Sequence, residues 1–228
     1  MNAARGFGER RSPMAGPGRG RGSFVRPPGD PPGTSRLFIA VPVPDDVRVA
    51  VGELMEDVAG APIDERALGQ PRWVRVDGLH LTVRFLGATP DVRQPALSAA
   101  MLAATRGAAP FRVVLSGGGA FPSPDRPRVL WIGIDQGAPQ LADLARRLDD
   151  LLQPLGWVPE SRPFAAHLTL ARTDGVAGAD ERARRLAYLA RDVSLSWQAD
   201  RLVLYRSILG RGPARYEALA EAPLTGTR

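Results

Sequence analysis

The frame His-Leu-Thr-apolar occurs twice in this chain, at residues 80–83 and 167–170, and contains its only two histidines. Each copy lies in an apolar run, GLHLTVRFLG and FAAHLTLAR, and such runs are typical of buried β-strands. Side chains alternate between the two faces of a strand, so each histidine shares a face with the threonine two residues later, roughly 6–7 Å away. Each copy therefore predicts a strand that buries its leucine and presents an imidazole and a hydroxyl on the other face.

The order of elements around the two copies also repeats. A strand, a helix and a histidine-containing strand follow one another twice, and a further helix comes after each series. The expected elements are strands at 36–41, 79–86, 128–135 and 164–172 and helices at 45–60, 91–106, 138–153 and 180–191. This repetition indicates an α+β fold with two pseudo-symmetric lobes. Each lobe would be an antiparallel sheet with helices packed outside, and an active-site cleft would lie between the two lobes.

Four other segments have specific local signals. Asp77-Gly78 separates the strand-like runs 73–76 and 79–86, which predicts a hairpin. The glycines at 117–119 indicate a bulge or loop, or a close approach to a ligand, in a strand at 111–121. Residues 193–209 predict one bent strand or a hairpin pair. Residues 216–224 are expected to close a sheet.

The N-terminal region differs from the rest of the chain. Residues 1–35 are rich in Gly, Pro and Arg and are predicted to form a disordered tail, whereas residues 36–228 are predicted to form the folded, bilobal domain. Residues 1–36 contain seven Arg against one Asp and one Glu, so most of the chain's net charge of +6 belongs to this tail. A linker, an over-extended start with translation beginning at Met14, and a phosphate-attracting arm are all compatible with it.

Missing residue types exclude several classes of chemistry. The chain has no cysteine, which excludes disulfides, thiolate nucleophiles and Cys-ligated zinc. It has no lysine, which excludes a side-chain Schiff base, a lysyl-nucleotide intermediate and a P-loop. No apolar run approaches the length of a membrane span, and the arginine-rich N-terminus lacks the apolar segment of a secretory signal. We expect no membrane association and a cytoplasmic location.

Two imidazoles and two hydroxyls in matching frames favour acid–base chemistry. One histidine can accept a proton while the other donates one, because imidazole titrates near neutral pH. Such a pair suits in-line attack at phosphorus, with the threonine hydroxyls bound to the non-bridging oxygens. A single histidine on a strand is usually structural, but two in identical frames favour catalysis. A closed zinc site needs four ligands, so two histidines do not predict a metal, and none is expected.

The two motifs and their flanking segments resemble a known family. HLTV and HLTL resemble the paired HxTx motifs of the 2H phosphoesterase superfamily. The segments RLFIAVPVP, WVRVDGLHLTVRFLG, RPRVLWIGI, RPFAAHLTLAR and LVLYRSILGRGPARYEAL resemble its RNA 2′,3′-cyclic phosphodiesterase branch, also called the 2′-5′ RNA ligase family. The resemblance covers about residues 36–224.

The resemblance implies a reaction and a role for each histidine. The implied reaction is hydrolysis of the 2′,3′-cyclic phosphate of an RNA end or a nucleoside, which leaves a 2′-phosphate and requires no cofactor. His80 would donate a proton to the departing 3′ oxygen, and His167 would activate water. Two alternatives stay open, namely 2′-5′ RNA ligation at the same site and a binding module for RNA ends or nucleotides with little turnover. A monomer is expected, because a cleft within one chain needs no dimer.

The resemblance also implies substrate-binding residues. Thr82 and Thr169 would hold the phosphate, and Arg172 would cradle it, which suits the planar guanidinium fork. A solvated charge at the strand end is the alternative for Arg172. Ala166 departs from the family pattern, in which proline often precedes the second histidine, and this puts the rigidity of the strand entry in doubt.

Four further side chains near the motifs each have two alternative roles. The aromatic residues Phe85, Trp73 and Phe164 are candidates for base stacking, although each fits a place in the core as well. Arg84 lies on the opposite face of its strand from Val83, so the alternation predicts that it reaches the cleft or solvent.

Overall fold

The computed structural model describes residues 31–61, 63, 70–210 and 212–227. Most of the expected tail lies outside these residues, and the first strand begins at Thr34, two residues before the expected start of the folded domain. The described helices and strands are β1 (Thr34–Pro42), α1 (Asp45–Ala59), β2 (Arg72–Trp73), β3 (His80–Pro90), α2 (Gln94–Thr105), β4 (Phe111–Phe121), β5 (Val129–Gln136), α3 (Ala138–Leu152), β6 (His167–Arg172), α4 (Ala179–Leu189), β7 (Leu195–Ala199), β8 (Arg201–Ile208) and β9 (Arg215–Pro223).

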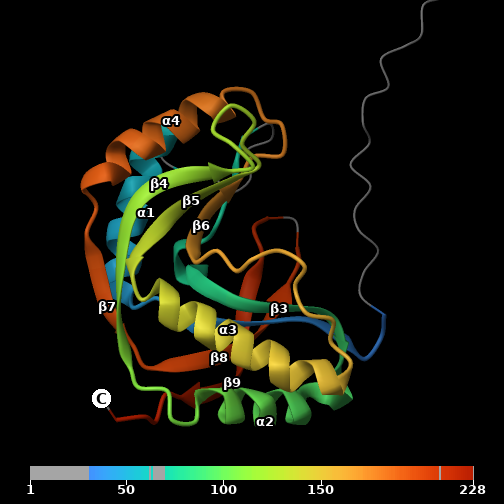
Figure 1. Cartoon of the computed structure of the whole chain (residues 1–228). Helices are drawn as coiled ribbons and strands as arrows, with labels where there is room; N and C mark the ends of the chain where they lie inside the picture. The colour runs from blue at the N-terminus through green and yellow to red at the C-terminus, as the bar shows by residue number, and fades with distance from the viewer. Residues whose placement is uncertain (1–30, 62, 64–69, 211, 228) are drawn as a thin grey trace, which may run out of the picture.

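These strands form two antiparallel sheets. The first sheet has the order β3-β1-β8-β9, and the second has the order β2-β6-β5-β4-β7 (Figure 1). The histidine strand β3 pairs with β1, and the histidine strand β6 pairs with β5, so the two halves use the same pairing. Strands β3 and β6 also contact each other where the sheets meet. The expected α+β fold with two pseudo-symmetric lobes is confirmed.

The lobes are interlocked, since neither is a continuous stretch of chain. Helix α1 follows β1 of the first sheet but packs against β7 and α4 of the second lobe. Helix α3 follows β5 of the second sheet but packs against β3 and α2 of the first lobe (Figure 1). The helix of each strand–helix–strand repeat therefore packs against the other lobe. The buried residues of both lobes form a single core.

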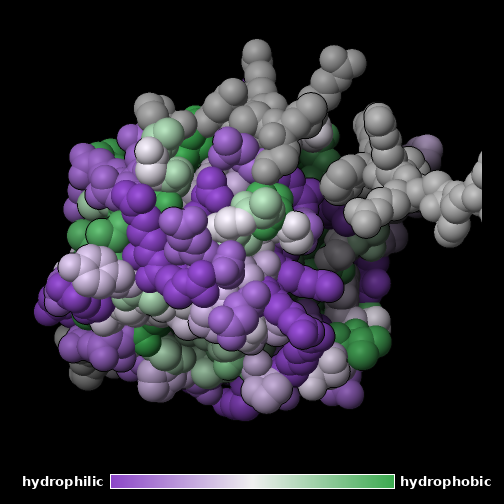
Figure 2. Space-filling model, turned by 90° about the horizontal axis from the view of Figure 1, so that it is seen from above, coloured by the Kyte–Doolittle hydropathy of each residue, from purple (hydrophilic) through white to green (hydrophobic). Residues whose placement is uncertain are grey.

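Helical spacing of apolar residues explains which faces are buried. In α1 the buried side chains recur at intervals of three and four residues, at Val47, Val51, Met55 and Val58. Helix α3 buries leucines with the same spacing. Helix α4 is the charged helix of the sequence and has few buried positions. It lies at the top of Figure 1, and Figure 2, which is seen from above, shows a largely hydrophilic face.

The predicted hairpin at Asp77-Gly78 is wrong. Trp73 and its neighbour pair with β6 in the second sheet, whereas the strand that begins at His80 pairs with β1 in the first. Residues Val76–Gly78 form a short 3-10 helix that carries the chain between the sheets. The type I′ hairpin turn needs positive φ angles, and Gly78 is not among the glycines with positive φ. An Asp-Gly pair therefore marks a turn here without joining the strands beside it.

The C-terminal segment also crosses between the sheets. Strand β7 pairs with β4 in the second sheet, and β8 pairs with β1 in the first, with only Asp200 between β7 and β8. The bent-strand interpretation is therefore closer than the hairpin. Strand β9 pairs with β8 and closes the first sheet, as expected.

The glycine run in β4 forms a bulge. Pairing with β5 shifts between Ser116 and Gly118, and Gly117 has a φ of 68°. The bulge predicted for this run is confirmed. Gly118 then lets α4 approach the sheet, because a Cβ atom there would lie 2.7 Å from the Leu186 side chain and 2.9 Å from its backbone oxygen.

Substituting Gly118 tests this close contact. We expect Gly118→Ala to lower the free energy of unfolding by about 1–3 kcal/mol, because the backbone of α4 must shift to admit a methyl group. The corresponding fall in Tm is roughly 2–10 °C in a thermal melt. Gly210→Ala is the matched control, since a Cβ at Gly210 meets no atom within 4 Å. Equal Tm values for the two variants would show that α4 does not pack on β4 in this way.

Candidate active site

Each histidine strand contains a β-bulge directly after its threonine. In β3, Thr82 pairs with Ala40 and Arg84 pairs with Ile39, so Val83 is the extra residue. A bulge shifts the alternation of side chains by one position. Phe85 therefore joins the face that presents His80 and Thr82.

The bulge in β6 has the same place in the frame. Thr169 pairs with Trp131 and Ala171 pairs with Leu130, which leaves Leu170 as the extra residue. Leu170 and Ala171 are consecutive buried residues, and the next residue, Arg172, is exposed. Strict alternation would have turned Arg172 toward the core. The bulge instead places it on the face of His167 and Thr169.

A cleft between the two strands contains four of the five expected site residues. His80 and Thr82 of β3 and Thr169 and Arg172 of β6 line a cavity of about 370 Å³. His167 is half-buried on the same face of β6 but does not line this cavity. The charge of a protonated His167 is among the causes that lower the pKa of His80, after burial and the charge of Arg48.

The expectation that Arg84 reaches the cleft or solvent is wrong. Because of the bulge, Arg84 points to the opposite face, where its side chain is only 4% exposed. Its guanidinium lies 2.7 Å from the Asp149 carboxylate and 2.9 Å from that of Glu160, and it donates to the Val158 carbonyl. Arg84 therefore ties β3 to α3 and to the segment that precedes β6.

Each histidine is hydrogen-bonded to the backbone carbonyl of the residue two positions before it. Nδ1 of His80 lies 2.7 Å from the Gly78 carbonyl, and Nδ1 of His167 lies 2.7 Å from the Ala165 carbonyl. A carbonyl oxygen only accepts, so Nδ1 is the donor in each ring. The neutral rings therefore keep their lone pair on Nε2, and Nε2 is the atom that gains or loses a proton.

The pKa of each imidazole lies below its ordinary value of 6.5, which favours the neutral form at pH 7. Burial is the main cause that lowers the pKa of His80 to about 4, and the charges of Arg48 and His167 lower it further against the effect of the Gly78 bond. The pKa of His167 is also lowered, first by burial and then by the charge of Arg172, and its carbonyl bond opposes this. A neutral imidazole is a competent proton acceptor, whereas a donor must first gain a proton.

An aromatic shell surrounds His80. The ring of Phe38 lies 4.6 Å from the imidazole centroid, and Tyr216 meets the imidazole edge-on at 5.0 Å. Tyr205 stacks on Phe38 at 5.3 Å, and its ring centroid lies 6.1 Å from that of the imidazole. These residues lie on β1, β8 and β9. They are brought together by sheet register, so no sequence motif predicted them near His80.

Two aromatic rings lie next to His167. Phe121 meets its ring edge-on at 5.1 Å, and Trp131 lies 6.5 Å away. Of the three aromatic residues considered for base stacking, Phe85 lines the cleft and is 56% exposed. Trp73 is a core residue, and Phe164 is partly buried against the core. Only Phe85 of these three is therefore placed to contact a ligand.

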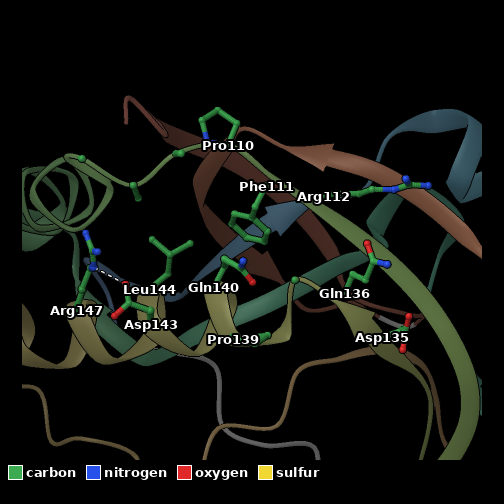
Figure 3. Close-up of a pocket in the computed structure, with 14 residues that line it drawn as sticks. Pro110, Phe111, Arg112, Asp135, Gln136, Pro139, Gln140, Asp143, Leu144 and Arg147 are labelled. Carbon is green, nitrogen blue, oxygen red and sulfur yellow. Dashed lines mark hydrogen bonds and ion pairs between the residues drawn. The ribbon is translucent and has the colours of Figure 1, made fainter. Parts of the chain in front are cut away.

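A larger cavity lies elsewhere in the molecule. It has a volume of about 810 Å³ and is formed by the start of β4, the end of β5 and the first turns of α3 (Figure 3). Arg147 is paired with Asp143 there at 2.7 Å, and Arg112 donates to Ser196. The cavity contains no histidine. The smaller cleft is the candidate active site, because it combines the imidazole, the hydroxyls and Arg172.

In the described ranges, no group of three or more His, Cys, Asp or Glu side chains is placed to hold a metal ion. None of the described helices combines the length and the apolar character that a membrane crossing requires.

The chain is similar to known proteins in sequence and in fold. The family model described as the 2′-5′ RNA ligase superfamily matches residues 43–211. A Geobacillus stearothermophilus protein named RNA 2′,3′-cyclic phosphodiesterase is 33% identical over 84% of this chain, which spans 58% of that relative. An Aeropyrum pernix protein of the same name is 35% identical over 65% of this chain and 83% of its own. The crystal structure of Escherichia coli LigT complexed with 3′-AMP is 28% identical and has a TM-score of 0.64 over 84% of this chain and 99% of its own.

Titrating the two imidazoles tests the electrostatics of the site. Because the chain has only two histidines, their ring signals are simple to follow by NMR as the pH is lowered. We expect both to titrate below the ordinary value of 6.5, with His80 at about 4. His167→Ala identifies the signal of His80 and should raise its pKa slightly. A ring that titrates at or above 6.5 in the free protein would contradict the burial described here.

Proposed function

The chain belongs to the 2′-5′ RNA ligase superfamily, and we propose that it hydrolyses the 2′,3′-cyclic phosphate of RNA ends to a 2′-phosphate. One observation carries the proposal. Two matching half-sites adjoin one cleft, and each contains an imidazole, a hydroxyl and a bulge. In each half-site, Nδ1 of the imidazole is hydrogen-bonded to a backbone carbonyl. Such a pair of Nε2 atoms suits a reaction that removes one proton and supplies another.

The proposed reaction proceeds in one in-line step. Nε2 of His167 accepts a proton from water while the water oxygen forms a bond to phosphorus. The bond between phosphorus and O3′ breaks, and protonated Nε2 of His80 donates its proton to O3′. The products are a 2′-phosphate and a 3′-hydroxyl, and the two histidines end with exchanged protonation states, which solvent restores. No cofactor or metal takes part in this scheme.

Three side chains are proposed to bind the phosphate. The hydroxyls of Thr82 and Thr169 line the cleft from opposite strands and are available to donate to the non-bridging oxygens. Arg172 is exposed at the end of β6, and among the described residues it has no ion-pair partner. A guanidinium in this position neutralises charge that builds up on the phosphate in the transition state.

The electrostatics fit the proposed roles once substrate is bound. The charge of Arg172 lowers the pKa of His167, which favours the neutral form that a base needs. His80 has a pKa of about 4 in the free protein and is neutral at pH 7. A bound phosphodiester is an anion, and an anion raises the pKa of a neighbouring imidazole. Substrate therefore favours protonation of His80, the proposed acid.

The relatives support the substrate class. The Geobacillus and Aeropyrum proteins are named for the same activity, and the E. coli structure contains 3′-AMP. The proposal includes a monomer, since one chain supplies both half-sites, and a cytoplasmic location.

Product analysis with histidine variants tests the proposal. The protein is incubated with adenosine 2′,3′-cyclic monophosphate in EDTA, and the wild type should release adenosine 2′-monophosphate alone. His80→Ala and His167→Ala should each lower kcat/KM by about 10²–10⁴-fold, because each removes one partner of the proton transfer. Tyr188→Ala, which removes an exposed ring on α4, is the control and should keep wild-type activity.

Other outcomes separate the alternatives. A 3′-phosphate product would refute the proposed leaving group, and full activity in either histidine variant would refute the acid–base pair. Binding without turnover would favour a nucleotide-binding module. Joining of two RNA ends without hydrolysis would favour the ligation alternative.

A further inference from the structure

A third cavity, lined mainly by polar and charged residues, lies at the start of β5 and the end of β6. Its volume is about 560 Å³, and it is formed by the connection from β4 to β5 and the connection from β6 to α4. These two connections lie side by side near the top of the molecule (Figure 1), on the side that Figure 2 shows as largely hydrophilic. The charged residues that line the cavity are Asp125, Arg126, Arg128, Asp174 and Asp180.

The three carboxylates in this cavity are paired with two other arginines, because Asp125 and Asp180 share Arg184. Asp174 is paired with Arg72 of β2. Arg184 of α4 lies 2.6 Å from the Asp180 carboxylate and 4.0 Å from that of Asp125. With Arg126 and Arg128, four arginines oppose these three carboxylates, so the cavity and its paired residues have a net charge of about +1.

Arg126 and Arg128 are the two arginines that line this cavity. Both are exposed, and neither forms an ion pair or a side-chain hydrogen bond within the part of the chain that the structure describes. Both arginines line the same cavity, and no carboxylate of the described residues is paired with either of them. Such an arrangement favours an anion, and a phosphate matches the planar guanidinium fork.

The cavity is joined to the active site by backbone hydrogen bonds. Arg172, which lines the cleft, pairs with Val129, the residue after Arg128. Thr173 donates from its backbone nitrogen to the Arg128 carbonyl at 3.0 Å and from its hydroxyl to the Pro127 carbonyl. Neighbouring strands are about 5 Å apart, so the backbone of Arg128 lies next to the Arg172 end of β6.

We propose that Arg126 and Arg128 form a second phosphate-binding subsite, which holds the RNA backbone one or more nucleotides upstream of the cyclic phosphate. The inference rests on the proposed function, because it takes the cyclic end to lie in the cleft. A single nucleoside cyclic phosphate has no upstream phosphodiester, and therefore gains nothing from the subsite. An RNA chain gains one or two charge-assisted contacts.

Comparing two substrates in one double variant tests the subsite. Steady-state kinetics are measured for Arg126→Ala/Arg128→Ala with adenosine 2′,3′-cyclic monophosphate and with a trinucleotide that has a 2′,3′-cyclic end. We expect KM for the trinucleotide to rise about tenfold with kcat unchanged, and both constants for the mononucleotide to stay at wild-type values. The salt dependence of trinucleotide KM should also weaken, with the slope of log KM against log salt falling by about 1.

A matched control removes the same charge from another face. Arg112→Ala/Arg146→Ala lies away from this cavity and should leave both substrates unaffected. An unchanged trinucleotide KM in Arg126→Ala/Arg128→Ala, or an equal rise for the mononucleotide, would overturn the subsite. If the wild type hydrolyses neither substrate, the proposed function fails first. Turnover of the mononucleotide without preference for the trinucleotide rejects only the subsite.

Discussion

The β-bulge after each threonine is the constraint on which the site depends. A regular strand would place every second residue after the histidine on the cleft face, and it would turn Arg172 into the core. With one extra residue, the strand keeps the histidine and threonine on the cleft face and moves Arg172 there as well. The same bulge in β3 places Phe85 on the cleft face with His80 and turns Arg84 to the opposite face. One irregularity therefore gives the two half-sites different third members, an exposed aromatic ring and a guanidinium.

The interlocked lobes hold these half-sites against each other. Helix α1 is covalently attached to the first sheet and packed on the second lobe, and helix α3 has the reverse relation. The ion pairs of Arg84 with Asp149 and Glu160 join β3 to α3 and to the segment that leads to β6. The lobes share one hydrophobic core, so moving one half-site relative to the other requires breaking buried contacts. A reaction that needs two Nε2 atoms at fixed separation benefits from such rigidity.

Much of this architecture was predictable from the sequence, because its signals are local. Alternating and helical periodicity predicted the elements, and the repeated His-Leu-Thr frame predicted two matching strands and four of the site residues. Arg172 came from the family resemblance alone. The hairpin at Asp77-Gly78 was wrong because the turn residues do not specify which sheet the next strand joins. The placement of Arg84 was wrong because a bulge depends on pairing with β1, and the aromatic shell of Phe38, Tyr205 and Tyr216 depends on register among strands that are distant in sequence.

The central claim is that two distant histidines act as one acid–base unit, and a double-mutant cycle tests it most directly. The measurement is kcat/KM for His80→Ala, His167→Ala and the variant with both changes, on one cyclic nucleotide. Groups that act as a unit are strongly non-additive, because removing either disables the shared step. The account predicts that the double variant is about as slow as the slower single variant. Losses that multiply, so that the double variant is slower by the product of both factors, would show that the histidines act independently.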